Sequence, residues 1–295
     1  MKKYLIALTA FLICSVTAGF GQKAIDLKFN LPVGAGFDYN IDMDMTTSGN
    51  VGGQEINANN TMNIGYNFAV AGDSADWKKM AATITRIAMN INANGMNINY
   101  DSDKPVDTTD MISSTFGKIL GSMKGGKFAF TMNKEGKVGS VTGMDELINN
   151  MSAAGGGASM MQGMTNAFSE ENFKNNLQQS FGFYPAKPVK PGDTWTNTTT
   201  TNTNGAEMTM NNTYTLESVS GNMANVKVNS TLSAPASASI DSMSGITTGN
   251  MQFDVKTGVP VSGDLGTKMD LTINANGQSM PMKMDIKMKI TGKKS

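Results

Sequence analysis

The chain has 295 residues, and its 24 basic and 24 acidic side chains leave no formal net charge, which argues against nucleic acid or an anionic membrane surface as the main partner. It contains no histidine, so a Ser-His-Asp catalytic site and a His-ligated zinc or iron centre are both excluded. Charged residues make up only 16% of the chain, and a surface that takes its polarity from Asn, Thr, Ser and Gly suits an exported protein.

The first 22 residues have the three-part layout of a secretory signal peptide. Lys2 and Lys3 precede an apolar run over residues 4–16, and small residues follow at Gly19 and Gly21. Because the run is short for a membrane span, we expect cleavage near residue 21 or 22. The mature protein is then expected in the periplasm or outside the cell, without spanning the membrane.

The only cysteine, Cys14, lies inside this apolar run. The residues before it, Phe11-Leu12-Ile13, lack the small residue that bacterial lipoprotein processing requires, so we expect no lipid anchor. After cleavage the chain has no thiol, which leaves neither a disulfide framework nor a cysteine nucleophile.

Alternating apolar and polar residues predict antiparallel strands through the first hundred residues. The runs 37–45 and 56–70 flank a Gly-rich turn and are expected to pair as a hairpin. The runs 87–91 and 96–100 flank an Asn-Gly turn and predict a second hairpin. The same alternation at 25–31 predicts an earlier strand.

The period becomes helical after residue 107, which predicts a helical insert over about 107–183. Apolar stripes predict helices at 111–123, 144–151 and 168–181, and a strand pair at 128–132 and 138–141 lies between the first two. Asp107 or Thr108 is placed to cap the first helix, and Gly155-Gly156-Gly157 is expected to be a flexible joint.

A Pro-rich connector at 184–194 leads into a segment that contains only predicted strands: 208–216, 224–232, 251–255, 260–265, 269–273 and 279–291. In the last run, methionine and isoleucine occupy one parity, while Pro281, three lysines and Asp285 occupy the other. One side of this strand should therefore be dry and the other wet. We predict a mainly β fold, in which residues 23–295 form a single domain of about ten antiparallel strands. The strands form a large curved sheet or barrel, with the helical insert over one face or mouth.

Two local patterns imitate binding motifs. Residues 121–127 satisfy the Gly-x4-Gly-Lys part of a phosphate loop, but Phe128 stands where Ser or Thr should hold magnesium, and the segment leaves a helix instead of entering one. The acidic residues at 101, 103, 107 and 110 could supply oxygen ligands to calcium, yet they lack the glycine and closing glutamate of a helix-loop-helix calcium site.

Methionine is unusually frequent, with 25 residues, and Met-x-Met patterns occur at Met43/Met45, Met208/Met210 and Met280/Met282/Met284. Thioethers can bind Cu(I), because soft sulfur suits a soft ion. Each pattern also lies on the apolar parity of a predicted strand, where methionine serves as an adaptable core residue. Cu(I) binding therefore stays an alternative.

Paired carboxylates could still support glycosidase chemistry, and Asp42 and Asp44 share one face of an early strand. An outward acidic ladder is normally a solvated face, so we predict that the protein is not an enzyme. We assign no catalytic, cofactor-binding or metal-binding residue and expect no cofactor.

Three segments carry a resemblance to a known family: Tyr100-Asp101-Ser102, the connector 185–191 with the following Gly192-Asp193-Thr194-Trp195, and residues 253–260. With these segments the chain resembles an uncharacterised family of exported bacterial β-rich proteins that has a domain-of-unknown-function label. The resemblance implies no catalytic residues. More loosely, a curved sheet closed by helices is similar in architecture to the half-barrels of periplasmic lipoprotein carriers.

The sequence predicts an exported, non-catalytic binding or carrier protein, with a hydrophobic small molecule or lipid as its ligand. The alternative from another class is a structural or interaction protein with a solid core that meets an envelope protein partner. An outer-membrane barrel is disfavoured by the helical insert and by an aromatic content of only 7%.

Overall fold

The fold is described from a computed structural model, which covers residues 23–295 apart from 52–53, 94–95, 107–110, 156–161, 163–164, 166–167, 204–205, 238–239 and 276–277. The expected signal peptide, the Asn-Gly turn, the caps at Asp107 and Thr108, and most of the glycine joint lie outside the described residues.

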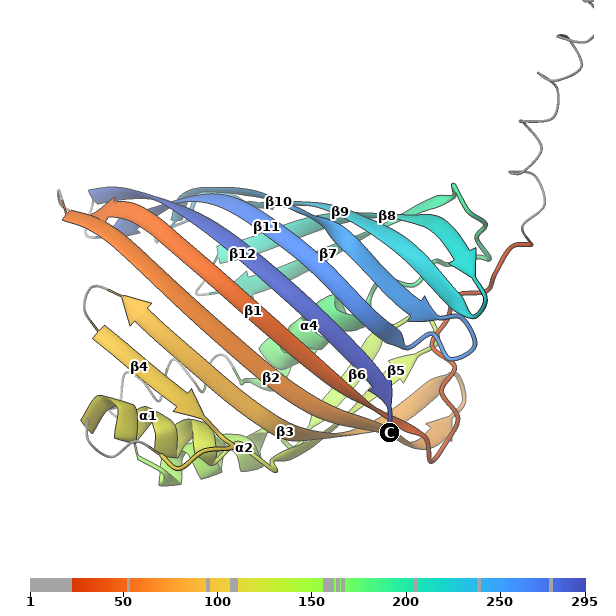
Figure 1. Ribbon diagram of the computed structural model, residues 1–295, viewed down its shortest axis with the longest axis horizontal. Helices are drawn as coiled ribbons and strands as arrows, with labels where there is room; N and C mark the ends of the chain where they lie inside the picture. Colours follow the sequence, from red (N-terminus) through yellow and green to blue (C-terminus); the bar gives the residue numbers. More distant parts are fainter. Residues whose placement is uncertain are drawn as a thin grey trace, which may run out of the picture.

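The elements follow the expected order of strands, a helical insert and further strands (Figure 1). They are β1 (Gly36–Val51), β2 (Gln54–Ser74), β3 (Trp77–Ala93), β4 (Met96–Asp101), α1 (Met111–Gly121), β5 (Lys127–Asn133), β6 (Val138–Thr142), α2 (Met144–Ala153), α4 (Glu170–Phe181), β7 (Thr194–Thr203), β8 (Ala206–Ser220), β9 (Met223–Ala234), β10 (Ile240–Asp254), β11 (Pro260–Ala275) and β12 (Gln278–Lys294).

Twelve strands in the described part of the chain form one antiparallel sheet, which is open and mainly follows the path β6-β5-β3-β2-β1-β12-β11-β10-β9-β8-β7. β4 pairs with β3 beside this path. The first and last strands of the chain, β1 and β12, are neighbours near the middle of the sheet. The sheet curls so that its edge strands β6 and β7 both approach α4 (Figure 1).

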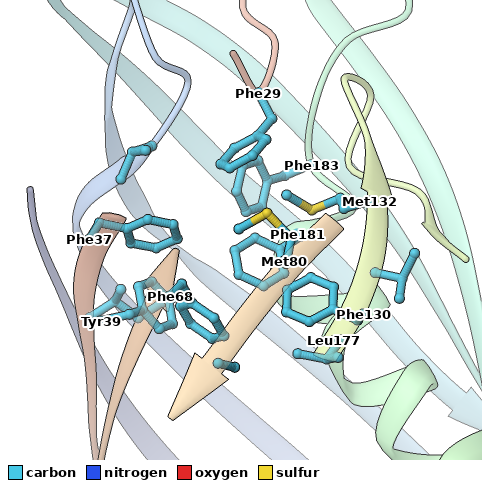
Figure 2. Packing of buried hydrophobic residues seen from close by; sticks show 14 of the residues in the cluster. Phe29, Phe37, Tyr39, Phe68, Met80, Phe130, Met132, Leu177, Phe181 and Phe183 are labelled. Carbon is cyan, nitrogen blue, oxygen red and sulfur yellow. The ribbon is translucent and has the colours of Figure 1, made fainter. Parts of the chain in front are cut away.

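The two ends of the sheet differ. The ends of β1, β3, β7 and β11 lie beside the starts of β2, β4, β8 and β12 at one end of the sheet, which we call the hairpin end. At the other, closed end, aromatic side chains from the sheet pack around Phe181 of α4 (Figure 2). The core is therefore concentrated toward one end of the curled sheet.

The predicted strand at 25–31 is wrong, although its alternation has a structural use. Leu27, Phe29 and Leu31 are fully buried and fill the closed end. Their backbone does not join the sheet. Instead the Phe29 N–H donates to Lys134 O at 2.9 Å, and the Asn30 N–H donates to Thr257 O at 2.8 Å.

The strand count also exceeds the expected ten. β7, with the sequence Thr-Trp-Thr-Asn-Thr-Thr-Thr-Thr-Asn-Thr, and the first part of β10 lack the apolar alternation on which the prediction relied. Strands were predicted separately at 260–265 and 269–273, but β11 is continuous through Gly266. The predicted hairpins β1–β2, β3–β4 and β5–β6 and the three helices are all present.

Candidate binding face

The inner face of the sheet is the face that meets α4. Tyr39 of β1 and Phe68 of β2 contact Phe181, with ring centroids 6.2 and 5.6 Å apart. Because side chains alternate along a strand, Met43 and Met45 lie on the same inner face as Tyr39. The intervening Asp42, Asp44 and Thr46 are exposed on the outer face.

Burial along the inner face of β12 falls from the closed end to the hairpin end, although Thr47 of β1 and Ala58 of β2 are buried near the hairpin end. On β12, Ile290 is buried, whereas the inward residues Met288, Ile286, Met284, Met282 and Met280 are each only half-buried. The residues between them, including Lys283, Asp285 and Lys287, are exposed. The predicted alternation is therefore correct, but the methionine side is shielded from water only in part.

We call the half-buried inward residues at this end the methionine face. It comprises those five residues of β12, Met43 and Met45 of β1, Met62 of β2, and Leu265, Met269 and Leu271 of β11. All of these side chains are uncharged and apolar, and adjacent strands place them opposite one another. The methionine face thus extends over four neighbouring strands, and the polar residues Thr47, Asn60 and Thr267 lie between its members on the same side of the sheet.

The inner face becomes polar on the strands toward β7. Ser230 of β9 donates to Asn212 Oδ1 at 2.6 Å, and Asn212 Nδ2 donates to Asn197 Oδ1 at 2.7 Å. Asn197 in turn donates to Gly182 O at the end of α4. This neutral chain of hydrogen bonds ties the β7 edge to the helix that lies between the two edges.

Two inward polar atoms have no hydrogen-bond partner among the described residues, although they are buried: Asn60 Oδ1 on β2 and Thr199 Oγ1 on β7. Thr199 also lines a groove of about 390 Å³ between the β5–β6 turn, α4 and β7. The other walls of this groove include Glu135, Lys137 and Gln178, so it is largely polar and separate in character from the methionine face.

The inner face offers little acid–base chemistry. Burial raises the pKa of Tyr66 to about 12 and raises the pKa values of Tyr39 and Tyr214 well above their usual range. These phenols therefore stay protonated at neutral pH and cannot act as bases.

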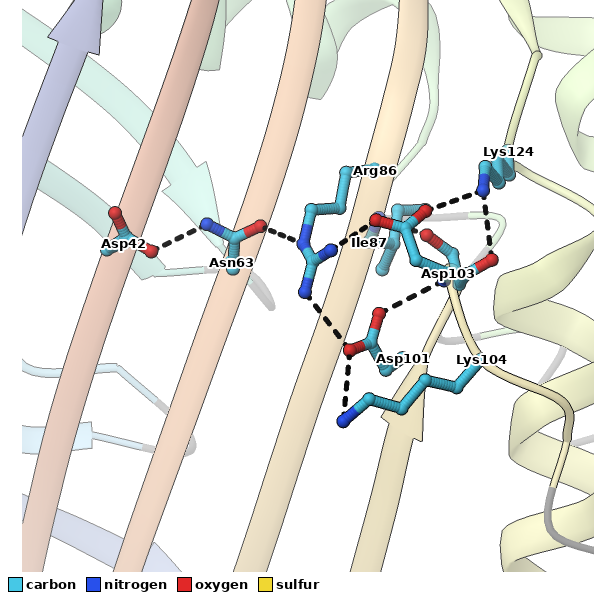
Figure 3. Close-up of polar contacts among 9 residues, drawn as sticks. Asp42, Asn63, Arg86, Ile87, Asp101, Asp103, Lys104 and Lys124 are labelled. Atoms are coloured by element: carbon cyan, nitrogen blue, oxygen red, sulfur yellow. Dashed lines mark hydrogen bonds and ion pairs between the residues drawn. The ribbon is translucent and has the colours of Figure 1, made fainter.

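The predicted acidic cluster is engaged in ion pairs on the outer face (Figure 3). Arg86 of β3 contacts Asp101 Oδ2 at 3.1 Å and also pairs with Asp103, which receives Lys124 Nζ at 2.6 Å. The Asp103 N–H lowers the pKa of Asp101, and the Lys124 ammonium lowers that of Asp103. These contacts join the β3–β4 hairpin to the turn after α1, while Asp107 and Asp110 lie outside the described residues.

The structure also shows where the other residues and motifs singled out in the sequence lie. Residues 121–127 run from the end of α1 into β5, opposite in direction to a phosphate loop. Asp42 accepts a hydrogen bond from Asn63 Nδ2 at 2.6 Å on the outer face. Trp195 stacks on Tyr214 and donates to Phe183 O at 2.8 Å, so it anchors the start of β7. In the described part of the chain, no three His, Cys, Asp or Glu residues are grouped to hold a metal ion.

The described residues include no helix that is long and apolar enough to cross a membrane. No curated protein sequence matches the chain.

Three solved structures are similar in part. A lipovitellin structure, whose title names lipid–protein interactions, aligns with 89% of this chain. The two sequences are 10% identical over this alignment, and the TM-score is 0.47. The chain spans about a quarter of that protein's length. An outer membrane channel from Pseudomonas putida F1 is 6% identical with a TM-score of 0.27, over 92% of this chain and 100% of its own. A DUF1329 family protein from Desulfovibrio piger is 8% identical with a TM-score of 0.15, over 84% and 83%. At such TM-scores these similarities carry no functional conclusion.

The sequence also matches one protein family over a long continuous segment. Residues 75–260, more than half of the chain, match it from the start of β3 to the start of β11. This span includes the helical insert and the strands β3 to β10, whereas the residues of the methionine face lie outside it. The chain belongs to a family of unknown function (DUF6263).

Proposed function

We propose that this protein is an exported, non-catalytic binding or carrier protein that takes an apolar, lipid-like ligand against the methionine face. Residues 23–295 would act as one unit after removal of residues 1–22. The observation that carries the proposal is the half-burial of the inward residues from Met288 to Met280, next to a closed end that is fully packed.

The size of the surface agrees with this proposal. Full burial of a methionine side chain is worth about 1.5–3 kcal/mol, so covering the remaining exposure of a half-buried one is worth roughly 1 kcal/mol at most. A micromolar complex requires about 8 kcal/mol. A ligand must therefore cover inward residues of several strands at once, which favours an extended apolar molecule over a small one.

Methionine also suits such a ligand. Its unbranched, polarizable side chain can repack around guests of different shape. The methionine face has no charged residue, so an acyl chain would meet no unpaired charge there. A non-catalytic role is supported by the missing histidine and by the paired state of Asp101 and Asp103.

The proposal is tested by titrating the purified, delipidated protein with a fluorescent fatty acid. We expect saturable binding by the native chain and at least tenfold weaker binding by Met284→Lys, because the new ammonium would lie in the apolar surface. Thr46→Lys is the matched control, since Thr46 lies on the outer face opposite Asp285 and should bind as the native chain does.

Two results would overturn the proposal. The first is a native chain that takes up no probe and carries no lipid in native mass spectrometry after purification from its own cells. That result would favour a solid-cored protein that acts through an envelope partner. The second is an equal loss of binding in Met284→Lys and Thr46→Lys. Export itself is checked by sequencing the mature N-terminus, which should begin near Gln22 or Lys23.

A further inference from the structure

Four methionines form one row across four adjacent strands. Met43 of β1 lies opposite Met62 of β2 on one side and opposite Met288 of β12 on the other. Met89 of β3 lies opposite Met62, which extends the row by one strand. All four side chains are half-buried on the inner face. No Met-x-Met pattern in the sequence contains this row, since its members come from distant parts of the chain.

The register brings the sulfur atoms within reach of a single ion. Residues directly opposite on antiparallel strands have Cβ atoms about 4.5–5.5 Å apart. Methionine has three rotatable bonds beyond its Cα, so the thioethers of Met62, Met43 and Met288 can converge above the central strand. Half-burial leaves them reachable from the hairpin end while it keeps them out of bulk water.

The chemistry of the row favours a soft ion of low charge. The row and its inward neighbours Met45, Ile286 and Leu265 include no carboxylate that could balance a divalent ion. Neutral thioethers prefer soft monovalent ions such as Cu(I) and Ag(I) to hard or borderline divalent ones.

A second observation points to a cation at the same place. Asn60 lies two residues before Met62 on the inner face of β2 and opposite Met45. Its Oδ1 atom is buried and receives no hydrogen bond within the described structure. A buried carbonyl oxygen without a donor is unfavourable, and a nearby cation would compensate it.

We propose that Met43, Met62 and Met288 bind one monovalent soft metal ion of the Cu(I) and Ag(I) class, with Met89 and Asn60 Oδ1 beside it. Binding changes no oxidation state and requires no proton transfer. Met43, Met62 and Met288 also belong to the methionine face, but the ion would use their sulfur atoms, whereas the proposed lipid-like ligand would use their apolar area.

The test uses Ag⁺ as the probe, since it undergoes no redox chemistry in air. Silver nitrate is titrated in chloride-free buffer by calorimetry and native mass spectrometry. Every sample is the processed chain without residues 1–22, because the thiolate of Cys14 would bind Ag⁺ more tightly than any thioether and mask the row. We expect one tightly bound Ag⁺ per native chain.

Leucine replacements distinguish sulfur from shape, because leucine keeps the apolar volume of methionine and removes the ligand atom. Met43→Leu should weaken Ag⁺ binding at least tenfold, and the triple replacement at Met43, Met62 and Met288 should abolish the tight site. The control triple replaces Met269, Met282 and Met284, which lie on the same face outside the row, and should change the affinity less than twofold.

The proposal is overturned if the native chain has no tight stoichiometric site, or if the control triple loses as much affinity as the row triple. It is also overturned if Met43→Leu binds Ag⁺ as the native chain does. Thermal unfolding checks that each variant is folded, and Met43→Leu alone decides the question if the row triple does not fold. X-ray absorption of the Ag⁺ complex should show sulfur neighbours, and coordination by nitrogen or oxygen alone contradicts the assignment.

Discussion

Truncation of Phe181 to alanine tests whether α4 is a main contributor to the packing of the closed end. Phe181 is the last residue of α4 and is fully buried at the closed end (Figure 2). Its ring lies 6.2 Å from Tyr39, 5.6 Å from Phe68 and 6.0 Å from Phe130, between ring centroids. These three partners come from β1, β2 and β5, so one side chain connects the helix with both the middle of the sheet and the strand next to its β6 edge.

The expected loss is large. Phe→Ala in a packed core lowers the free energy of unfolding by about 3–5 kcal/mol. The three ring contacts place Phe181 toward the upper end of this range, since each aromatic pair contributes about 0.5–1.5 kcal/mol beyond its area. Domains have a total stability of about 5–15 kcal/mol. The variant should therefore lose a third or more of it, with a fall in Tm of roughly 10 °C.

Urea unfolding followed by circular dichroism and by tryptophan fluorescence measures this loss. Ile246→Ala is the control, because Ile246 is 59% exposed on the outer face of β10 and its truncation should change the free energy of unfolding by less than about 0.5 kcal/mol. A loss below about 1.5 kcal/mol for Phe181→Ala would refute the view that α4 is a main contributor to the closed end.

Three further predictions concern the surface and the turns. Arg86→Met removes the contacts with Asp101 and Asp103 and should lower stability by about 1 kcal/mol, seen as faster hydrogen exchange in β4 and in the turn after α1. Because the pKa values of both carboxyl groups are lowered in the folded protein, their contribution is present at neutral pH. This contribution to stability should be lost as the pH falls below 3.8, which is the ordinary pKa of an aspartate side chain, and through the lower pKa values of Asp101 and Asp103 in the folded protein. Urea unfolding of the native chain at neutral pH and at about pH 3 should show this fall, and Arg86→Met should show a smaller one; equal falls contradict the assignment. Gly34→Ala and Gly136→Ala both place a side chain at positive φ, but only at Gly136 would the Cβ overlap a carbonyl oxygen of α4. Thermal unfolding should therefore show a loss near 1–2 kcal/mol for Gly34→Ala and a larger one for Gly136→Ala, and the reverse order would contradict the position of α4.

The local parts of the fold were predictable from the sequence. The hairpin β1–β2 and the helix α4 each carry their own period, and the alternation at 279–291 correctly separates the inward methionines from the outward lysines. Such signals are local because a strand or a helix presents its faces at a fixed period.

The remaining parts depend on contacts between distant segments. The alternation at 25–31 marks buried side chains, but it does not tell what the backbone pairs with, and here Phe29 and Asn30 bond to the turns at Lys134 and Thr257 and not to a strand. β7 has an inner face of Asn and Thr, so its place in the sheet follows from pairing with β8 and from the contact of Asn197 with α4. The pairing of β1 with β12 likewise joins the two ends of the chain and has no local signal.

The methionine row shows the same limit at the candidate site. Met43, Met62 and Met288 each fit a local alternation, and only the register of β2, β1 and β12 places them side by side. The sequence patterns suggested thioether pairs within single strands. The structure instead groups thioethers across strands, which changes the residues that a test must replace.

The distribution of residue types along the inner face argues that the methionines do more than fill a core. On β1 and β2 the inward residues change from aromatic at the closed end through isoleucine to methionine, and on β12 the buried Ile290 is followed mainly by methionine. Isoleucine and valine are better strand formers, and methionine loses more side-chain entropy when it is ordered. Stability alone would therefore favour branched residues at these positions. Adaptability to a guest and the sulfur atom itself are the two properties that methionine adds. Leucine keeps most of the apolar surface and removes the sulfur. Fatty-acid binding that survives leucine at Met43, while Ag⁺ binding does not, would assign separate uses to the area and to the sulfur of one face.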